Sequence, residues 1–184
     1  FPTHEDGGNC VSEIIANGII PAGMEIMDKA LIEATDNFSK AGYPRDVELL
    51  LIVELDGTAS EVDELINKIA EISKKNNSST IKISKNEKER LSFWIGRKAA
   101  FPACGAMAPD YYCMDGSIPR GKLAEALKEI NKLSKKYNLS VANCFHAGDG
   151  NLHPLIMFDG SKKEELRKTR SEEHTSELQS HLNL

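Results

Sequence analysis

Residues 140–158, SVANCFHAGDGNLHPLIMF, contain two apolar runs separated by an Asp149-Gly150 pair. Asp-Gly is favoured at the two central positions of a type I′ turn, the tight turn that joins neighbouring antiparallel strands. The sequence therefore predicts a hairpin, with one strand at about 140–148 and the other at about 151–158. This hairpin closes the expected core, and the rest of the fold is built outward from it.

The predicted hairpin carries two of the five histidines of the chain. With a two-residue turn His146 lies directly opposite His153, and opposed side chains share one side of a sheet with Cβ atoms about 4.5–5.5 Å apart. Neutral imidazole is a common ligand of zinc, manganese or iron, and Gly148 and Gly150 leave space above the pair. Two imidazoles do not complete a site, so a carboxylate elsewhere would have to join them. A pair of ordinary half-buried histidines is the alternative.

The chain before the hairpin alternates between helical and strand patterns. Helices are indicated by apolar residues three and four positions apart, and strands by short continuous or alternating apolar runs. We expect helices at 10–19 and 22–38, a buried strand at 48–55, a helix from Ser60 to about 75, a strand at 80–84, a helix at 86–101 and a loop to 118. Ser60, with Asp63 three residues later, marks the start of its helix. A last helix begins at Pro119 and faces the core with Leu123, Leu127, Ile130 and Leu133.

This order of elements predicts an α+β fold, an antiparallel sheet with helices on one face in a ferredoxin-like sandwich. We expect one domain over residues 1–160, incomplete at both ends, followed by a solvated tail at 161–184. The tail is mostly charged or hydroxylated and loses hydrophobic periodicity. From about residue 170 it also resembles a translated sequencing adaptor, so we expect it to be foreign to the parent protein and to add nothing to stability.

Composition excludes several classes of protein. The chain has 184 residues, 40% of them hydrophobic, and a net charge of -5 with a pI near 5.6, which provides no electrostatic footprint for nucleic acid. No apolar run approaches the roughly 20 residues of a membrane span. The four cysteines are widely spaced, which favours free thiols in a reducing compartment. We therefore expect a cytoplasmic protein. The cysteines are Cys10, Cys104, Cys113 and Cys144.

Four segments together resemble one protein family. They are HAGDGNLHP (146–154), AGYPRDVELLLIVELDG (41–57), WIGRKAAFPACG (94–105) and APDYYCMDGSIPR (108–120). In consistent order over about residues 5–160, they resemble the C-terminal cap domain of FAD-linked 2-hydroxy-acid oxidoreductases, the family of the glycolate oxidase flavoprotein subunit and of D-lactate dehydrogenase. The resemblance implies an α+β, ferredoxin-like cap that covers the substrate side of the flavin.

The resemblance also implies cofactors and a metal site. FAD would be bound mainly by a domain absent from this chain, and His146 and His153 would be ligands of a divalent metal. The family's third ligand is a glutamate in a Gly-Glu-His-Gly segment, and the histidine beside it is the proposed general base. We expect that segment beyond the end of this chain. Glu173-His174 lacks the flanking glycines and comes too soon, so we do not assign it this role.

Arg97 is the substrate-binding candidate. It follows Trp94 by three residues on one predicted helix face, and it matches an arginine that grips a substrate carboxylate in the family. The alternative is a solvent-facing arginine in an ion pair. Relatives that act on dicarboxylic hydroxy acids have a lysine where Cys113 stands here, so the resemblance favours a short substrate, glycolate or D-lactate.

The expected function is therefore oxidation of a short 2-hydroxy acid to the 2-oxo acid, with hydride transfer to flavin and a metal that polarises the substrate. Partners would be the hydroxy acid and companion subunits of a glycolate oxidase complex. A chain without the flavin domain and the base is expected to be inactive alone. The alternative from another class is a non-catalytic ferredoxin-like module that binds a small molecule.

Overall fold

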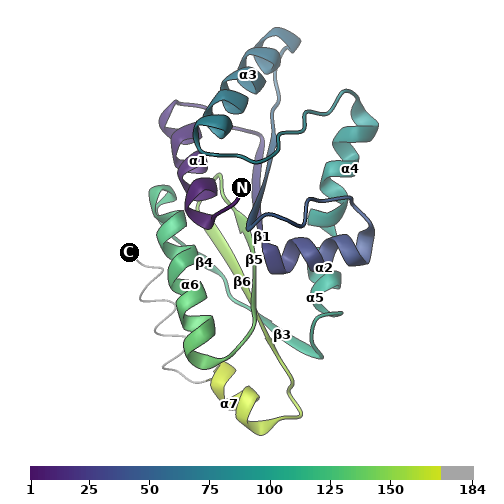
Figure 1. Cartoon of the computed structure of the whole chain (residues 1–184), viewed down its shortest axis with the longest axis vertical. Coiled ribbons are helices and arrows are strands. Elements are labelled where there is room, and N and C mark those ends of the chain that lie inside the picture. The colour runs from purple at the N-terminus through teal and green to yellow at the C-terminus, as the bar shows by residue number, and fades with distance from the viewer. Residues whose placement is uncertain (171–184) are drawn as a thin grey trace.

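The computed structural model describes residues 1–170, which form an antiparallel sheet between two layers of helices (Figure 1). The elements, in chain order, are α1 (His4–Ala16), β1 (Gly23–Asp28), α2 (Lys29–Ser39), β2 (Leu49–Glu54), α3 (Ala59–Lys75), α4 (Glu87–Lys98), α5 (Ala100–Cys104), β3 (Asp110–Cys113), β4 (Gly116–Ser117), the 3-10 turn η1 (Arg120–Lys122), α6 (Leu123–Tyr137), β5 (Val141–His146), β6 (Asn151–Phe158) and α7 (Lys163–Arg170).

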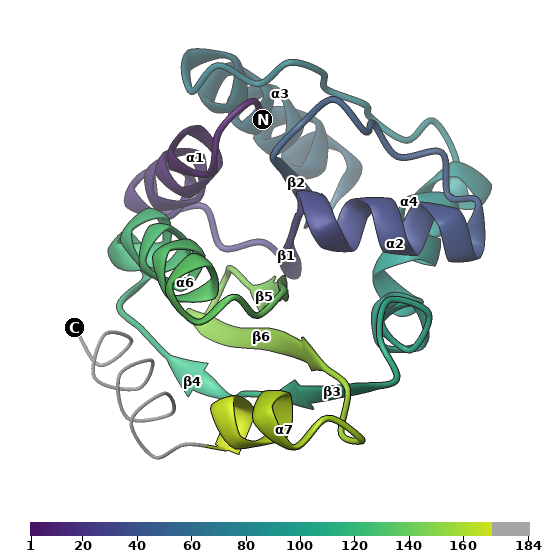
Figure 2. The same ribbon diagram turned by 60° about the horizontal axis from the view of Figure 1, so that its bottom comes forward.

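The strands lie in the order β2-β1-β5-β6-β3, and β4 also pairs with β6. All of these pairings are antiparallel. The expected α+β class with an antiparallel sheet is confirmed. The structure adds a second helical layer to the single layer expected, because α1, α3 and α6 cover one face while α2, α4 and α5 cover the other (Figure 2).

The two faces follow from the alternation of side chains along β1. Ile26 packs into the core beneath α1 and α6, whereas its neighbour Met27 packs beneath α2 and α5. A strand buried on both faces reads as a continuous apolar run, which sequence periodicity alone does not separate from a buried helix. The inward face predicted for α6 is confirmed, since Leu123, Leu127, Ile130 and Leu133 are all buried.

The helix predicted over 22–38 is wrong in its first part. Met24 and Met27 lie in the interior strand β1, which pairs with β2 on one side and β5 on the other. The helix begins only at Lys29, because the Asp28 carboxylate accepts a hydrogen bond from Leu31 N at 3.0 Å and caps α2. Residues 22–38, whose apolar spacing suits a single helix, are therefore divided between the strand β1 and the helix α2.

Other predictions are confirmed or corrected at their ends. The strand at 48–55 is β2, and the helix expected from Ser60 is α3, which is capped two residues earlier by a reciprocal pair of hydrogen bonds between Thr58 and Glu61. The strand predicted at 80–84 is wrong: these residues are irregular, and Ile83 is half exposed. The predicted loop before residue 118 instead contributes β3 and β4, which pair with β6.

The part of the chain expected as a tail begins with a helix. α7 contacts β6, and its Thr169 is buried. The boundary proposed at residue 160 and the foreign origin of the segment from about 170 stay predictions, and residues 171–184 lie outside the described part of the chain. Within residues 1–170, no helix is long and apolar enough to cross a membrane.

Candidate functional site

The hairpin joins β5 to β6 through four residues, 147–150, rather than through the two-residue turn that the Asp-Gly pair predicts. His146 therefore opposes Asn151, and His153 opposes Cys144. The predicted direct pairing of the two histidines is wrong. The register is shifted by two residues along one strand.

Tertiary contacts explain the longer turn. The side chain of Ala147 is buried in the core, and Gly148 N donates a hydrogen bond to Met24 O of β1 at 3.3 Å. Gly150 has φ 79°, in the left-handed region that glycine adopts without strain, and its N–H donates to His146 O at 3.1 Å. The turn thus folds onto β1, a contact that spacing along the hairpin does not reveal.

The two histidines nevertheless lie together on the face covered by α2, α4 and α5. A shift of two residues keeps a side chain on the same side of a sheet, so His146 and His153 are diagonal neighbours. Their ring centroids are 5.2 Å apart and the rings are perpendicular. His153 Nδ1 lies 3.8 Å from Asp115 Oδ1, beyond hydrogen-bond distance. The imidazoles therefore converge as expected, through a different register.

Glu25 of β1 links His146 to Arg97. Its Oε1 lies 2.7 Å from His146 Nδ1, and its Oε2 accepts hydrogen bonds from Arg97 Nε at 3.0 Å and Nη2 at 2.9 Å. The side chains of Glu25 and Arg97 are only 12% and 13% exposed. The ion pair foreseen as the alternative for Arg97 does form, but it is largely buried rather than solvent-facing. Substrate binding by Arg97 stays a prediction.

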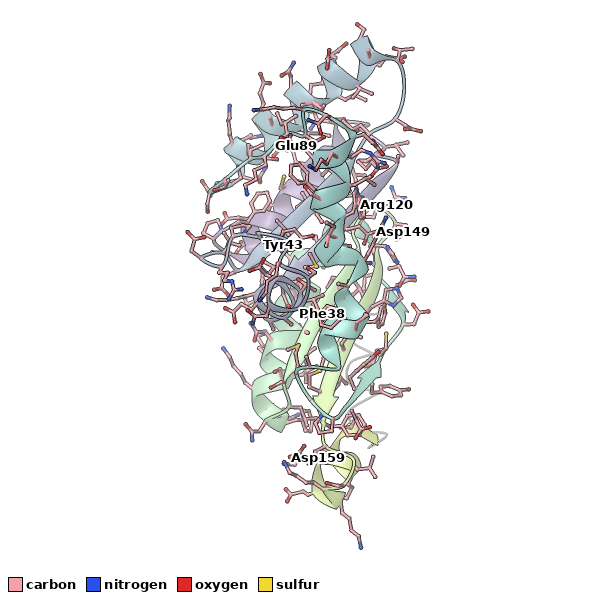
Figure 3. The ribbon with its side chains drawn as sticks, turned by 90° about the vertical axis from the view of Figure 1, so that its right-hand side faces the viewer. Phe38, Tyr43, Glu89, Arg120, Asp149 and Asp159 are labelled. Carbon is pink, nitrogen blue, oxygen red and sulfur yellow. The ribbon has the colours of Figure 1, made fainter. Side chains whose placement is uncertain are left out.

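A pocket of about 380 Å³ opens beside the hairpin turn. Glu25 and His146 line it together with Arg120 and Asp149, which Figure 3 shows close together at one edge of the molecule. Charges of both signs thus surround a space next to the cluster of His146, Glu25 and Arg97. A small polar molecule has room there to approach His146.

Cys144, which opposes His153, is not suited to act as a thiolate. Burial above all raises the pKa of its thiol to about 12, so the sulfur stays protonated at neutral pH. Within residues 1–170 no three His, Cys, Asp or Glu side chains form a group that could hold a metal ion. The described part of the chain therefore brings two imidazoles together without a third ligand of these types.

Sequence reasoning missed Glu25, Asp115 and Asn151. The only signal for Glu25 was a single acidic residue inside the apolar run GMEIM, which is costly in a buried strand unless its charge is paired. Asn151 opposes His146 and so points to the same face, where its Oδ1 is buried and has no hydrogen-bond partner among the described residues. Such orphaned acceptors are uncommon in protein interiors.

Comparisons with known proteins identify the family of the chain. The chain is 50% identical over 168 residues to "Glycolate oxidase subunit GlcD" of Escherichia coli (strain K12), an overlap of 91% of this chain and 34% of that protein. It is 30% identical over 176 residues to "D-lactate dehydrogenase [cytochrome], mitochondrial" of Arabidopsis thaliana, or 95% of this chain and 31% of the relative. The chain thus spans about a third of the length of the curated relatives it matches.

Solved structures show the same fold at low sequence identity. A 4-ethylphenol oxidase from Gulosibacter chungangensis superposes with a TM-score of 0.62 at 14% identity, over 97% of this chain and 42% of that one. An alkyldihydroxyacetonephosphate synthase superposes with a TM-score of 0.59 at 13% identity, over 85% and 34%. A family profile described as "FAD linked oxidases, C-terminal domain" matches residues 1–178. The chain therefore belongs to the FAD-linked oxidases, as their C-terminal domain.

Proposed function

We propose that the chain is the substrate-side domain of an FAD-dependent oxidoreductase that converts a short 2-hydroxy acid, glycolate or D-lactate, to the 2-oxo acid. The cluster of His146, Glu25 and Arg97 carries the proposal, because Glu25 joins an imidazole that could bind a metal to a guanidinium that could bind a carboxylate. Glu25 and His146 also line the pocket beside the hairpin turn. The relatives named glycolate oxidase subunit and D-lactate dehydrogenase support the substrate class. FAD is implied by the family.

The residues fit a divalent metal in part. Because His146 Nδ1 faces the Glu25 carboxylate, its proton is held there and the lone pair of Nε2 is directed elsewhere, the arrangement common for metal-bound histidine. His153 supplies a second imidazole, and the orphaned Oδ1 of Asn151 adds an acceptor on the same face. We propose zinc, manganese or iron here, with the remaining protein ligand and the general base outside residues 1–170.

A metal bound at these histidines would lower the pKa of the substrate hydroxyl. The residues of this chain would do the rest of the positioning. Arg97 would bind the substrate carboxylate through Nη1, which makes no hydrogen bond among the described residues, while Nε and Nη2 stay on Glu25. Glu25 contacts both side chains at once, so this one residue would hold His146 and Arg97 at a fixed spacing.

The proposed short substrate rests on Cys113. This side chain lies on β3, in the segment where the resemblance expects a lysine in relatives that bind dicarboxylic acids. Burial above all raises the pKa of its thiol, which is therefore neutral at neutral pH. A second substrate carboxylate would find no cation at this position. We further propose that companion subunits of a glycolate oxidase complex are partners of this protein. We also propose that it is located in the cytoplasm and that this chain by itself is inactive.

Titration calorimetry with Zn²⁺ or Mn²⁺ at pH 7.5 tests the metal ligands in this chain. Weak binding is expected, because two imidazoles hold the ion without the third ligand. His146→Ala and His153→Ala should each lose most of the affinity, whereas His4→Ala, which changes a histidine of α1 outside the cluster, should keep it.

Equal metal affinity in wild type and both hairpin variants would contradict the proposal. Binding of glycolate or D-lactate that does not depend on metal and survives His146→Ala would favour the non-catalytic module instead.

A further inference from the structure

A tyrosine hydroxyl bridges two backbone groups of α4 that ordinarily bond to each other. Tyr43 Oη donates to Phe93 O at 2.5 Å and accepts from Arg97 N at 3.2 Å. In an α-helix the N–H of residue 97 would pair with the C=O of residue 93, four positions earlier. The hydroxyl thus sits at the turn of α4 that carries Arg97.

The ring of Tyr43 reaches this position because residue 96 is glycine. A Cβ added to Gly96 would lie 2.1 Å from Cε2 and 2.8 Å from the hydroxyl oxygen of Tyr43, which is far inside van der Waals contact. Gly96 is buried, and the ring occupies the space that any side chain there would need. Tyr43 lies against α4 in Figure 3. The two residues therefore form one fitted contact.

The loop that presents Tyr43 is tied to the end of α2 by Asp36. Its Oδ1 accepts hydrogen bonds from the backbone N–H of Gly42 at 2.7 Å and of Tyr43 at 3.2 Å. Its Oδ2 accepts from Arg45 Nε at 2.8 Å and Nη2 at 2.5 Å. Four hydrogen bonds to one carboxylate hold the loop on both sides of Tyr43. The backbone of Tyr43 is therefore fixed relative to α2 while its ring packs against α4.

We propose that Tyr43 is a positioning residue for Arg97. Its hydroxyl sets the backbone of α4 at residue 97, so that the guanidinium meets Glu25 with two hydrogen bonds and leaves Nη1 directed away from that carboxylate. This inference rests on the proposed function only for the identity of the ligand that Nη1 binds. Glu25 also contacts His146, so the hydroxyl of Tyr43, in the loop after α2, is linked to the histidine pair through the side chains of Arg97 and Glu25.

Burial above all raises the pKa of Tyr43, which keeps its proton available for Phe93 O. Tyr43→Phe is then a precise perturbation, because it removes one oxygen and leaves the ring packed against Gly96. Phe93 O then loses a donor and Arg97 N loses an acceptor, which changes the hydrogen bonding of the helical turn that carries the guanidinium. The Arg97 contact with Glu25 should loosen.

Solvent exchange of the Arg97 Nε–H in ¹⁵N NMR of the whole chain measures this contact directly. Tyr43→Phe should speed that exchange at least about fivefold, the factor that corresponds to about 1 kcal/mol for one hydrogen bond. Tyr112→Phe is the matched control, since it removes the hydroxyl of an exposed tyrosine on β3 and should leave the exchange unchanged. Gly96→Ala, which displaces the ring, should speed exchange as well.

Unchanged Arg97 Nε–H exchange in a folded Tyr43→Phe chain would overturn the proposal. If Tyr43→Phe does not fold, Gly96→Ala decides in its place by the same criterion. Millimolar glycolate, added with Zn²⁺ present, then separates the positioning role from the proposed function. It should shift the Arg97 signal in wild type and in Tyr112→Phe, and less in Tyr43→Phe. Faster exchange without any glycolate response in wild type would support the positioning role and contradict the proposed function of Arg97.

Discussion

Glu25→Gln should destabilise the chain far more than its conservative shape suggests. The Glu25 carboxylate accepts two hydrogen bonds from Arg97 on one oxygen and faces His146 Nδ1 with the other. A glutamine keeps one acceptor oxygen and replaces the other by an NH₂ donor. Whichever way the amide turns, it presents a donor either to the guanidinium or to the imidazole proton, and the Arg97 charge loses its counter-ion.

The magnitude follows from burial. Removing one partner of a fully buried ion pair costs about 3–5 kcal/mol. Here the side chains of Glu25 and Arg97 keep 12% and 13% exposure, and the glutamine retains one acceptor. These two features reduce the expected loss to about 2–3 kcal/mol, an estimate within the range for broken buried networks. For a chain of this length that corresponds to a fall in Tm of about 5–10 °C.

Thermal unfolding at pH 7.5 with EDTA present is the assay, so that no bound metal contributes. Glu54→Gln is the matched control, because Glu54 also pairs with an α4 arginine, Arg90, at 2.9 Å. That pair is 32% and 38% exposed, and an exposed pair contributes about 1 kcal/mol or less. A Glu25→Gln chain whose Tm falls no more than that of Glu54→Gln would refute the idea that the buried pair stabilises the site.

Three further predictions concern the frame around the site. Hydrogen bonds from Arg45, more than any other cause, lower the pKa of Asp36 below 3.8. The ionised Asp36 therefore stabilises the fold above that pH, and this contribution is lost as the pH falls through the folded-state pKa. Acid titration should show a smaller loss of folding stability below pH 4 for Asp36→Asn than for wild type. Gly8→Ala should lower Tm by several degrees, because its Cβ would lie 2.7–2.9 Å from Ala124 atoms that include backbone, whereas Gly121→Ala, with open space, should not. Asp28→Asn should cost about 1–3 kcal/mol in chemical denaturation, since three buried donors need an acceptor there; an unchanged midpoint would count against that network.

The two hairpin histidines lie on one face of the sheet, as predicted, although the predicted register is wrong. The Asp-Gly pair suggested a two-residue turn, and the structure has four residues from 147 to 150. The predicted face survived because the two registers differ by an even number of residues, and side chains alternate with a period of two. A shift by one residue would have sent one histidine to the opposite core. The position of each imidazole along its strand depended on Gly148 reaching Met24 O.

Local sequence decided what depends on neighbours in the chain. The strand β2, the helices α3 and α6, and the placement of His146 and His153 on one face follow from hydrophobic period and capping residues. The resemblance in four segments likewise identified the family. These features can be predicted without knowing which elements pack together, because each depends only on residues within its own element.

Tertiary structure alone decided which elements meet. β1 became a strand because β2 and β5 lie on both sides of it, although its apolar spacing also suits a helix. Glu25 and Arg97 are 72 residues apart in sequence, and Tyr43 is 54 residues from the amide it accepts from. A buried charge is stable only next to its partner, and that partner is a matter of packing between distant segments. The chemistry of the site therefore appears only when the sheet brings β1, α4 and the hairpin together.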